Sequence, residues 1–177
     1  VPEIDENTAF SLSSTRFADQ VAEAKAAGFV TRPVIVGPVT FLALAKASDD
    51  AAEGFSPLSR LHDVLPVYVE LLAALRAAGA EWVQIDEPAL VSESLPYAPA
   101  ELAEAARVAY DVLAGVAERP QILVAAGYAQ LSPEAWGVLA ASNVDGIAID
   151  LRRGSVPAPV AGLENKVLVG GVIDGRN

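Results

Sequence analysis

The sequence predicts an α/β fold built on parallel strands, and three observations support this prediction. Short apolar segments alternate along the chain with longer segments whose apolar residues have helical spacing. The connections between successive strands are too long for hairpins and suit parallel crossovers. Two strands, 34–36 and 122–124, are apolar on both faces, as expected for a sheet that helices cover.

The first third of the chain contains one helix and up to two strands. The apolar start allows an opening strand at 1–4. Helical spacing runs through 13–28, where Gly28 ends the helix. Residues 32–37 form a strand that Gly37-Pro38 closes. Residues 47–58 are rich in Ala, Asp, Gly and Pro, so they are expected to form an exposed loop.

The middle of the chain is a long helix followed by a strand. Residues 61–78 place their apolar side chains on a single stripe, and Gly79 ends this helix. Pro66 is expected near the first turn, where no intrahelical donor is lost. Residues 81–87 then form an apolar strand that runs directly into two carboxylates and a proline.

The last third repeats the alternation. A helix is expected at 99–116 and a strand at 121–125. Ser132-Pro133 is a strong helix start, with a capping hydroxyl and a proline at the first helical position, and this helix reaches about residue 141. The remaining elements are strands at 145–150 and 166–170.

Together the elements include about six parallel strands, whereas a closed eight-stranded barrel of this type takes roughly 250 residues. The sequence therefore predicts a partial TIM-like (β/α)8 barrel, incomplete at both ends, with residues 1–177 forming a single partial barrel domain.

Composition excludes several classes of function. The net charge of −11 argues against nucleic acid and anionic membranes as partners, and no apolar run is long enough to span a bilayer. The absence of cysteine excludes disulfides, thiolate zinc sites and cysteine nucleophiles, and it agrees with a cytoplasmic location. Because no initiator Met is present, the chain is expected to begin inside a longer polypeptide.

The most informative segment contains Asp86 and Glu87. Neighbouring strand residues point to opposite faces, so one carboxylate should face the sheet interior while the other turns into the loop. Acids at the carboxyl end of a buried strand are where α/β proteins place binding groups. Asp150 and Asp174 also lie at strand ends. These four acids are the candidate substrate-binding residues.

A structural role is the alternative for these acids, and it is the one we favour. In that interpretation they hold loops in place by accepting backbone N–H groups and by pairing with Arg152, Arg153 or Arg176.

Other conspicuous residues are interpreted as structural. His62 is the only histidine and has no partner for metal binding or for activating a nucleophile. Residues 37–40 lack the Gly spacing and the Lys of a phosphate loop and form a βα turn. Trp82 is expected in the core, and Trp136 in helix packing.

Several blocks of sequence resemble one enzyme family. They include Val1-Pro2-Glu3, residues 32–41, residues 65–68, the long block 79–90 with Ile85-Asp86-Glu87-Pro88, and the closing segment 174–177. Together they resemble cobalamin-independent methionine synthase, the 5-methyltetrahydropteroyltriglutamate–homocysteine methyltransferase. The resemblance implies a two-barrel enzyme that transfers a methyl group from 5-methyltetrahydrofolate polyglutamate to homocysteine. The order of the blocks places this chain in the N-terminal half.

The resemblance also implies that catalysis belongs to the other half. In the catalytic half of the family a zinc ion is held by His, Cys, Glu and a second Cys. The first three ligands fall at Ala125, Gly127 and Asp150 of this sequence, and the fourth falls beyond residue 177. The family's proton-donating His falls at Arg176, and the acid that receives the amine of homocysteine falls at Asp86. Neither a metal site nor a catalytic residue is therefore expected here.

Two functions follow as expectations. In the first, the chain is a scaffold that docks the C-terminal catalytic barrel, which carries the zinc, and homocysteine and methylfolate bind only in the full enzyme. In the second, it is a free-standing module that holds a small cation or an amino acid at a mouth formed by Asp86, Asp150 and Asp174. In either case open strand edges lead us to expect that the isolated chain self-associates or is poorly stable.

Overall fold

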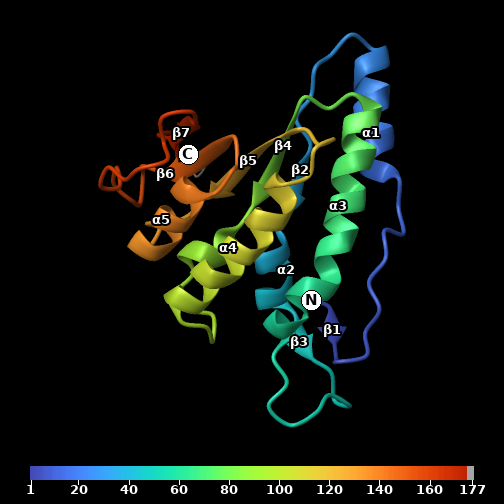
Figure 1. Cartoon of the computed structure of the whole chain (residues 1–177), viewed down its shortest axis with the longest axis vertical. Coiled ribbons are helices and arrows are strands. Elements are labelled where there is room, and N and C mark those ends of the chain that lie inside the picture. Colours follow the sequence, from blue (N-terminus) through green and yellow to red (C-terminus); the bar gives the residue numbers. More distant parts are fainter. Residues whose placement is uncertain (175–177) are drawn as a thin grey trace.

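The computed structural model describes residues 1–174 and consists of two parallel sheets and a layer of helices (Figure 1). The strands are β1 (Glu3–Ile4), β2 (Val34–Val36), β3 (Lys46–Ala47), β4 (Trp82–Asp86), β5 (Gln121–Ala126), β6 (Gly146–Asp150) and β7 (Val167–Gly171). The helices are α1 (Arg16–Ala26), α2 (Pro38–Leu44), α3 (Leu61–Ala78), α4 (Pro99–Ala114) and α5 (Pro133–Ala141), with short 3-10 turns at Pro57–Arg60 and Pro88–Val91.

The main sheet has five strands in the order β2-β4-β5-β6-β7, and every neighbouring pair is parallel. The predicted parallel α/β fold is confirmed. The helices pack in succession, α1 on α3, α3 on α4 and α4 on α5, and they form a layer on one side of the sheet (Figure 1). Ile85, Ile122 and Ile147 are fully buried beneath this layer. The other face of the sheet corresponds to the interior of a barrel.

Within residues 1–174 the sheet does not close, because β2 and β7 each have a neighbour on one side only. The prediction of an incomplete barrel is therefore confirmed. All five residues of β7 are exposed, including Leu168, whose equivalents on the inner strands lie beneath helices. Among residues 1–174, no helix combines the length and the apolar character needed to cross a membrane.

The opening strand forms, but it does not belong to the main sheet. β1 pairs with β3 in a separate two-stranded sheet, and β3 overlaps the start of the predicted 47–58 loop. Ile4 is buried there, and the Arg60 guanidinium donates to the carbonyls of Asp5 and Thr8. These contacts hold the N-terminal segment against the start of α3, so it cannot serve as a barrel strand.

Helix α2 lies where the sequence indicates only a turn. Five of its seven residues are buried, so it shows no amphipathic period. Its N-cap is Gly37, which has no side chain that could accept a hydrogen bond. The apolar period and the side-chain cap are therefore missing, and Pro38 at the first helical position is the one local signal.

Pro66 is also placed differently from the expectation. α3 begins at Leu61, so Pro66 is inside the helix and past its first turn. A proline has no N–H to donate to the carbonyl four residues earlier, which is that of His62. Both residues are exposed, so water can reach this carbonyl. The predicted end of the helix is confirmed, since Gly79 has a φ of 100°.

Candidate binding site at the carboxyl ends of the strands

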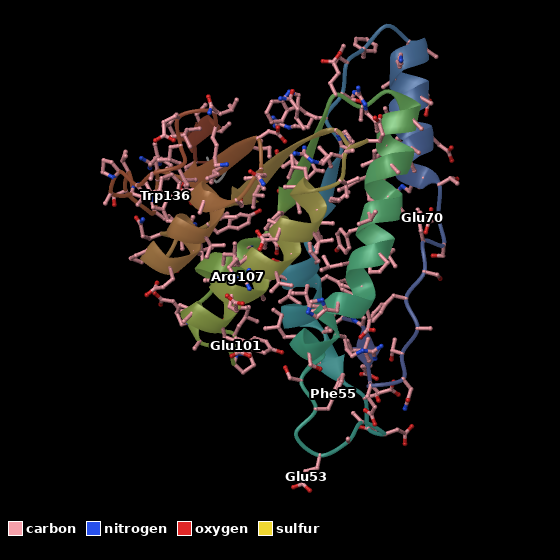
Figure 2. All side chains as sticks on the ribbon, in the orientation of Figure 1. Glu53, Phe55, Glu70, Glu101, Arg107 and Trp136 are labelled. Atoms are coloured by element: carbon pink, nitrogen blue, oxygen red, sulfur yellow. The ribbon has the colours of Figure 1, made fainter. Side chains whose placement is uncertain are left out.

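A cavity of about 510 Å³ opens at the carboxyl ends of β4 to β7, on the face opposite the helices. Asp150 and Asp174 line this cavity together with Arg152 and Arg153. Asp86 lies in the same inner row, because its Cα partners on the neighbouring strands are Val36 and Ala125, and Ala125 lines the cavity. The charged side chains of the helical layer, such as Glu70 on α3 and Glu101 and Arg107 on α4, lie elsewhere (Figure 2).

Glu87 lies outside this cavity. Its side chain is fully buried between α2 and α4, where four groups donate hydrogen bonds to its carboxylate. The donors are the Val39 N–H at 3.2 Å, the Thr40 N–H at 2.7 Å, the Thr40 hydroxyl at 2.6 Å and the Tyr110 hydroxyl at 3.0 Å.

These contacts make Glu87 the cap of α2. The first N–H groups of a helix have no intrahelical partner, and a side-chain oxygen usually accepts from the second or third of them. In α2 the first position is Pro38, which has no N–H, and Val39 and Thr40 follow it. Glu87 supplies the missing acceptor from the end of β4, 47 residues away from Thr40 in sequence. Its negative charge also suits the positive end of the helix dipole.

Burial has a strong effect on this carboxyl group. Loss of hydration raises the pKa of Glu87 to about 7, although the hydrogen bonds from Thr40, Tyr110 and Val39 oppose that shift. Burial likewise raises the pKa of the Tyr110 hydroxyl, and the nearby Glu87 charge adds to the shift. The Glu87 carboxyl therefore changes its protonation near neutral pH, inside a packed core.

Asp86 and Glu87 point to opposite faces, as the strand pattern predicts. Asp86 is half-buried on the inner face, where Gln84 Nε2 donates to its Oδ1 at 2.8 Å. Glu87 does lie in the turn that follows β4, as expected, but its side chain does not extend along that loop and is enclosed by α2 and α4. The reason is the unsatisfied N-terminus of α2, which sequence periodicity does not reveal.

Asp150 joins two loops at the mouth. Its carboxylate accepts the backbone N–H groups of Arg152, Arg153 and Tyr128. The N–H groups of Arg152 and Arg153 lower the pKa of Asp150, and that of Tyr128 contributes to the same effect. Tyr128 has a φ of 84°, a strained value for a residue other than glycine, and Arg153 donates to its carbonyl. Asp150 thus fixes the loop after β5 to the loop after β6.

The expected arginine pairs do not form in the described part of the chain. Asp86, Glu87 and Asp150 accept hydrogen bonds from amides and hydroxyls but make no ion pair with Arg152 or Arg153. Asp150 accepts backbone N–H groups, and Asp86 accepts the side-chain amide of Gln84. The expectations for Arg176 and for segment 175–177 lie outside the described residues.

The donor set of this mouth does not fit a zinc ion. Ala125 and Gly127, where the resemblance places two ligands, line the cavity with no side-chain donor atom. The third position, Asp150, already accepts three backbone N–H groups. Within residues 1–174, no three His, Cys, Asp or Glu side chains gather as a metal site would require.

Sequence reasoning missed two residues of the buried network, Thr40 and Tyr110. The Thr40 hydroxyl donates to Glu87 and accepts the Ala89 N–H at 3.1 Å, so it links α2 to the turn after β4. Thr40 is the one polar side chain in a buried apolar run, which is a signal in the sequence. Tyr110 lies within the apolar stripe of α4 and offers no such signal.

The role predicted for Trp136 is confirmed: it is buried in α5 and donates to the Ala158 carbonyl (Figure 2).

Comparison with known proteins gives a consistent result. The family model described as "Cobalamin-independent synthase, N-terminal domain" matches residues 1–177. The 5-methyltetrahydropteroyltriglutamate–homocysteine methyltransferase of Streptomyces avermitilis is 50% identical over 182 residues, which cover 100% of this chain and 23% of that protein. The corresponding proteins of Rhodococcus jostii and Mycobacterium tuberculosis are 47% and 46% identical and are covered over 23% and 22% of their lengths. The chain thus spans less than a quarter of these relatives.

Solved structures show the same fold. A protein from Listeria monocytogenes, described as a vitamin-B12-independent methionine synthase, superposes with a TM-score of 0.70 at 17% identity, over 99% of this chain and 56% of that chain. A B12-independent methionine synthase from Shewanella sp. W3-18-1, in complex with selenomethionine, gives a TM-score of 0.59 at 16% identity, over 85% and 46%. At these identities the likeness concerns the fold alone.

Proposed function

Because this chain belongs to the cobalamin-independent methionine synthases, as their N-terminal domain, we propose that it is a non-catalytic scaffold of such an enzyme. The complete enzyme would transfer a methyl group from 5-methyltetrahydrofolate polyglutamate to homocysteine, in keeping with the names of its relatives. We place this activity in the cytoplasm, which the cysteine-free composition favours.

The observation that supports a scaffold role is the use of the carboxylates at the strand ends. Glu87 caps α2, and Asp150 joins two loops through three backbone N–H groups. A carboxylate whose lone pairs are taken by backbone amides holds the protein in shape and is not available to a substrate. In this proposal Glu87 serves the packing of α2 and Asp150 serves the loops of the mouth, and neither takes part in chemistry.

The proposed partner is the C-terminal catalytic barrel of the parent enzyme, which is expected to hold the zinc. Zinc there would make the thiol of homocysteine reactive. At the three matched positions this chain offers at most one ligand, Asp150, since Ala125 and Gly127 have no donor side chains. Its contribution is a rigid wall beside the folate cleft, held in shape by the Glu87 and Asp150 contacts.

The test is an assay of methyl transfer by the purified 177-residue chain with zinc, homocysteine and methylfolate. We expect no methionine above the background without protein, because residues 1–174 contain no group of side chains that could hold the zinc needed to activate a thiol. The full-length enzyme of Streptomyces avermitilis is the positive control. Turnover by the chain alone would disprove the proposal.

A second candidate is a free-standing binding module, and the cavity of about 510 Å³ favours it. Arg152 and Arg153 line the cavity beside Asp150 and Asp174, so its mixed charges suit an amino acid better than a bare cation. Calorimetric titration with homocysteine separates the two functions. A scaffold gives no heat of binding, whereas a module gives binding that Asp86→Ala weakens while the melting temperature stays unchanged.

A further inference from the structure

The loops after β5 and β6 form a fixed rim beside the cavity at the carboxyl ends of the strands. Tyr128 in the first loop is held at both backbone groups, because its N–H donates to Asp150 and its carbonyl accepts from Arg153. Gln130 ties the loops again by accepting the N–H and the hydroxyl of Ser155. β5 and β6 have a neighbour on each side, so this rim does not depend on the open edges of the sheet.

Tyr128 combines backbone strain with an exposed ring. Its φ of 84° belongs to the left-handed region, which a residue with a large side chain rarely adopts. The strain is not accompanied by burial, since 72% of the residue is exposed, and it lines the cavity. Strained residues that surrounding contacts hold in place are concentrated at binding and active sites. The conformation of Tyr128 therefore indicates a role for its ring at the mouth and not in the core.

Arg152 brings a positive charge to the same cavity. The Asp150 carboxylate accepts the backbone N–H groups of Arg152 and Arg153, and it forms no ion pair with either guanidinium. Within residues 1–174 the guanidinium of Arg152 makes no ion pair at all. A guanidinium has five N–H donors and binds a carboxylate through two parallel hydrogen bonds. Arg152 can therefore receive a carboxylate that enters the cavity from solvent.

The floor of the cavity consists of small apolar side chains. Ala125, Ala148 and Val169 line it. They form one row across β5, β6 and β7, because Ala125 is the Cα partner of Ala148, and Ala148 is that of Val169. Alanine leaves space above the sheet, and the volume of about 510 Å³ is in the range of small-molecule sites. A flat ring fits on this floor beside Tyr128.

We propose that this rim binds an aromatic carboxylate, whose acid group pairs with Arg152 while its ring lies between Tyr128 and the apolar floor. A short aliphatic acid would leave the tyrosine ring without a contact. Asp174 also lines the cavity, so its negative charge favours a ligand with one carboxylate over a ligand with two. The site uses neither zinc nor a thiol, so the inference does not depend on the proposed function.

The test is titration of the isotope-labelled chain with benzoate, followed by the NMR shifts of its backbone amides. We expect saturable shifts at Tyr128, Arg152 and their loop neighbours, with a dissociation constant of about 1 mM, as suits a ligand of so few atoms. Acetate lacks the ring and benzyl alcohol lacks the charge. Each of these matched ligands should bind about tenfold more weakly than benzoate.

Two variants separate the contributions of the charge and the ring. Arg152→Gln should weaken benzoate binding about tenfold, because a charge-assisted pair of hydrogen bonds is lost. Tyr128→Gly should weaken it about fivefold without lowering the melting temperature, because glycine accepts the positive φ while the ring is removed. Arg16→Gln is the matched control: it removes an exposed arginine from α1 and should leave binding unchanged.

Four results would each overturn the proposal. Benzoate causes no saturable shift, it shifts only amides away from this rim, acetate binds as well as benzoate, or Arg152→Gln binds benzoate as tightly as the wild type. Unchanged binding by folded Tyr128→Gly would likewise remove the ring from the site and overturn it. None of these results bears on methyl transfer, so this proposal and the scaffold function can fail separately.

Discussion

Glu87 combines full burial with a carboxyl group that accepts four hydrogen bonds. The sequence predicts an acid at the end of this strand and the opposite orientation of Asp86. It does not predict the burial, because the partners Thr40 and Tyr110 lie 47 and 23 residues away. Contacts at such separations depend on how α2 and α4 pack, and a linear pattern does not contain that information.

The raised pKa of Glu87 predicts how stability depends on pH. Between pH 4.5 and about 7 the folded chain keeps a proton that the unfolded chain releases. The free energy of unfolding should therefore fall as the pH rises through this window, by about 3 kcal/mol at most. Asp5, Glu104 and Asp150 have lowered pKa values. Their contributions to the free energy of unfolding are therefore lost only at lower pH and do not mask the trend.

Urea unfolding at about pH 5, 6, 7 and 8 measures this slope across the window. Glu87→Gln removes the titrating group and should abolish the slope. Both proteins are compared in a His62→Gln background, which removes the single histidine of the sequence. A slope that survives unchanged in the Glu87→Gln protein would show that another group is responsible.

Individual helices and strands follow local signals to different degrees. Ser132 caps α5 by accepting the Ala135 N–H, and Gly79 ends α3, both as the sequence predicts. These signals act within a few residues of each other. α2 has no capping oxygen within a few residues, since the oxygens that accept its first N–H groups belong to Glu87. An element stabilised from a distant part of the chain is therefore the one that sequence reasoning misses.

Gly37, between β2 and α2, is so close to Glu87 that adding one methyl group there is expected to destabilise the folded chain. A Cβ at Gly37 would overlap the carboxyl group of Glu87, although the φ of −74° suits any residue. Gly37→Ala must push Glu87 away from the Val39 and Thr40 N–H groups. We expect a loss of about 3 kcal/mol in the free energy of unfolding, from overpacking and from broken hydrogen bonds.

Chemical denaturation of Gly37→Ala and of a control, Gly127→Ala, checks this expectation. A Cβ at Gly127 meets no atom within 4 Å, so the control should change stability by less than about 0.5 kcal/mol. Equal stability of the two variants would contradict the proposed cap.

For the molecule as a whole, counting elements predicts the architecture well. The spacing of apolar segments predicts a parallel sheet that falls short of a closed barrel, and the five-stranded sheet has that form. The count overestimates by one strand, because β1 pairs with β3 instead. A strand's partner depends on tertiary contacts such as those of Arg60 with Asp5 and Thr8, which the pattern of β1 does not contain.

The open edges also predict that stability depends on concentration. If unfolding separates two chains, each tenfold increase in concentration adds about 1.4 kcal/mol per dimer. With the unfolding entropy of two chains of this length, the melting temperature should rise by about 2 °C per tenfold increase. Val167→Lys, at the edge strand β7, should melt at a lower temperature that does not change with concentration. Val112→Lys, the same change on the exposed side of α4, should behave as the wild type. Thermal unfolding followed by circular dichroism over a roughly hundredfold range of concentration measures this. A melting temperature independent of concentration in the wild-type chain would mean that the edges of β2 and β7 remain unpaired.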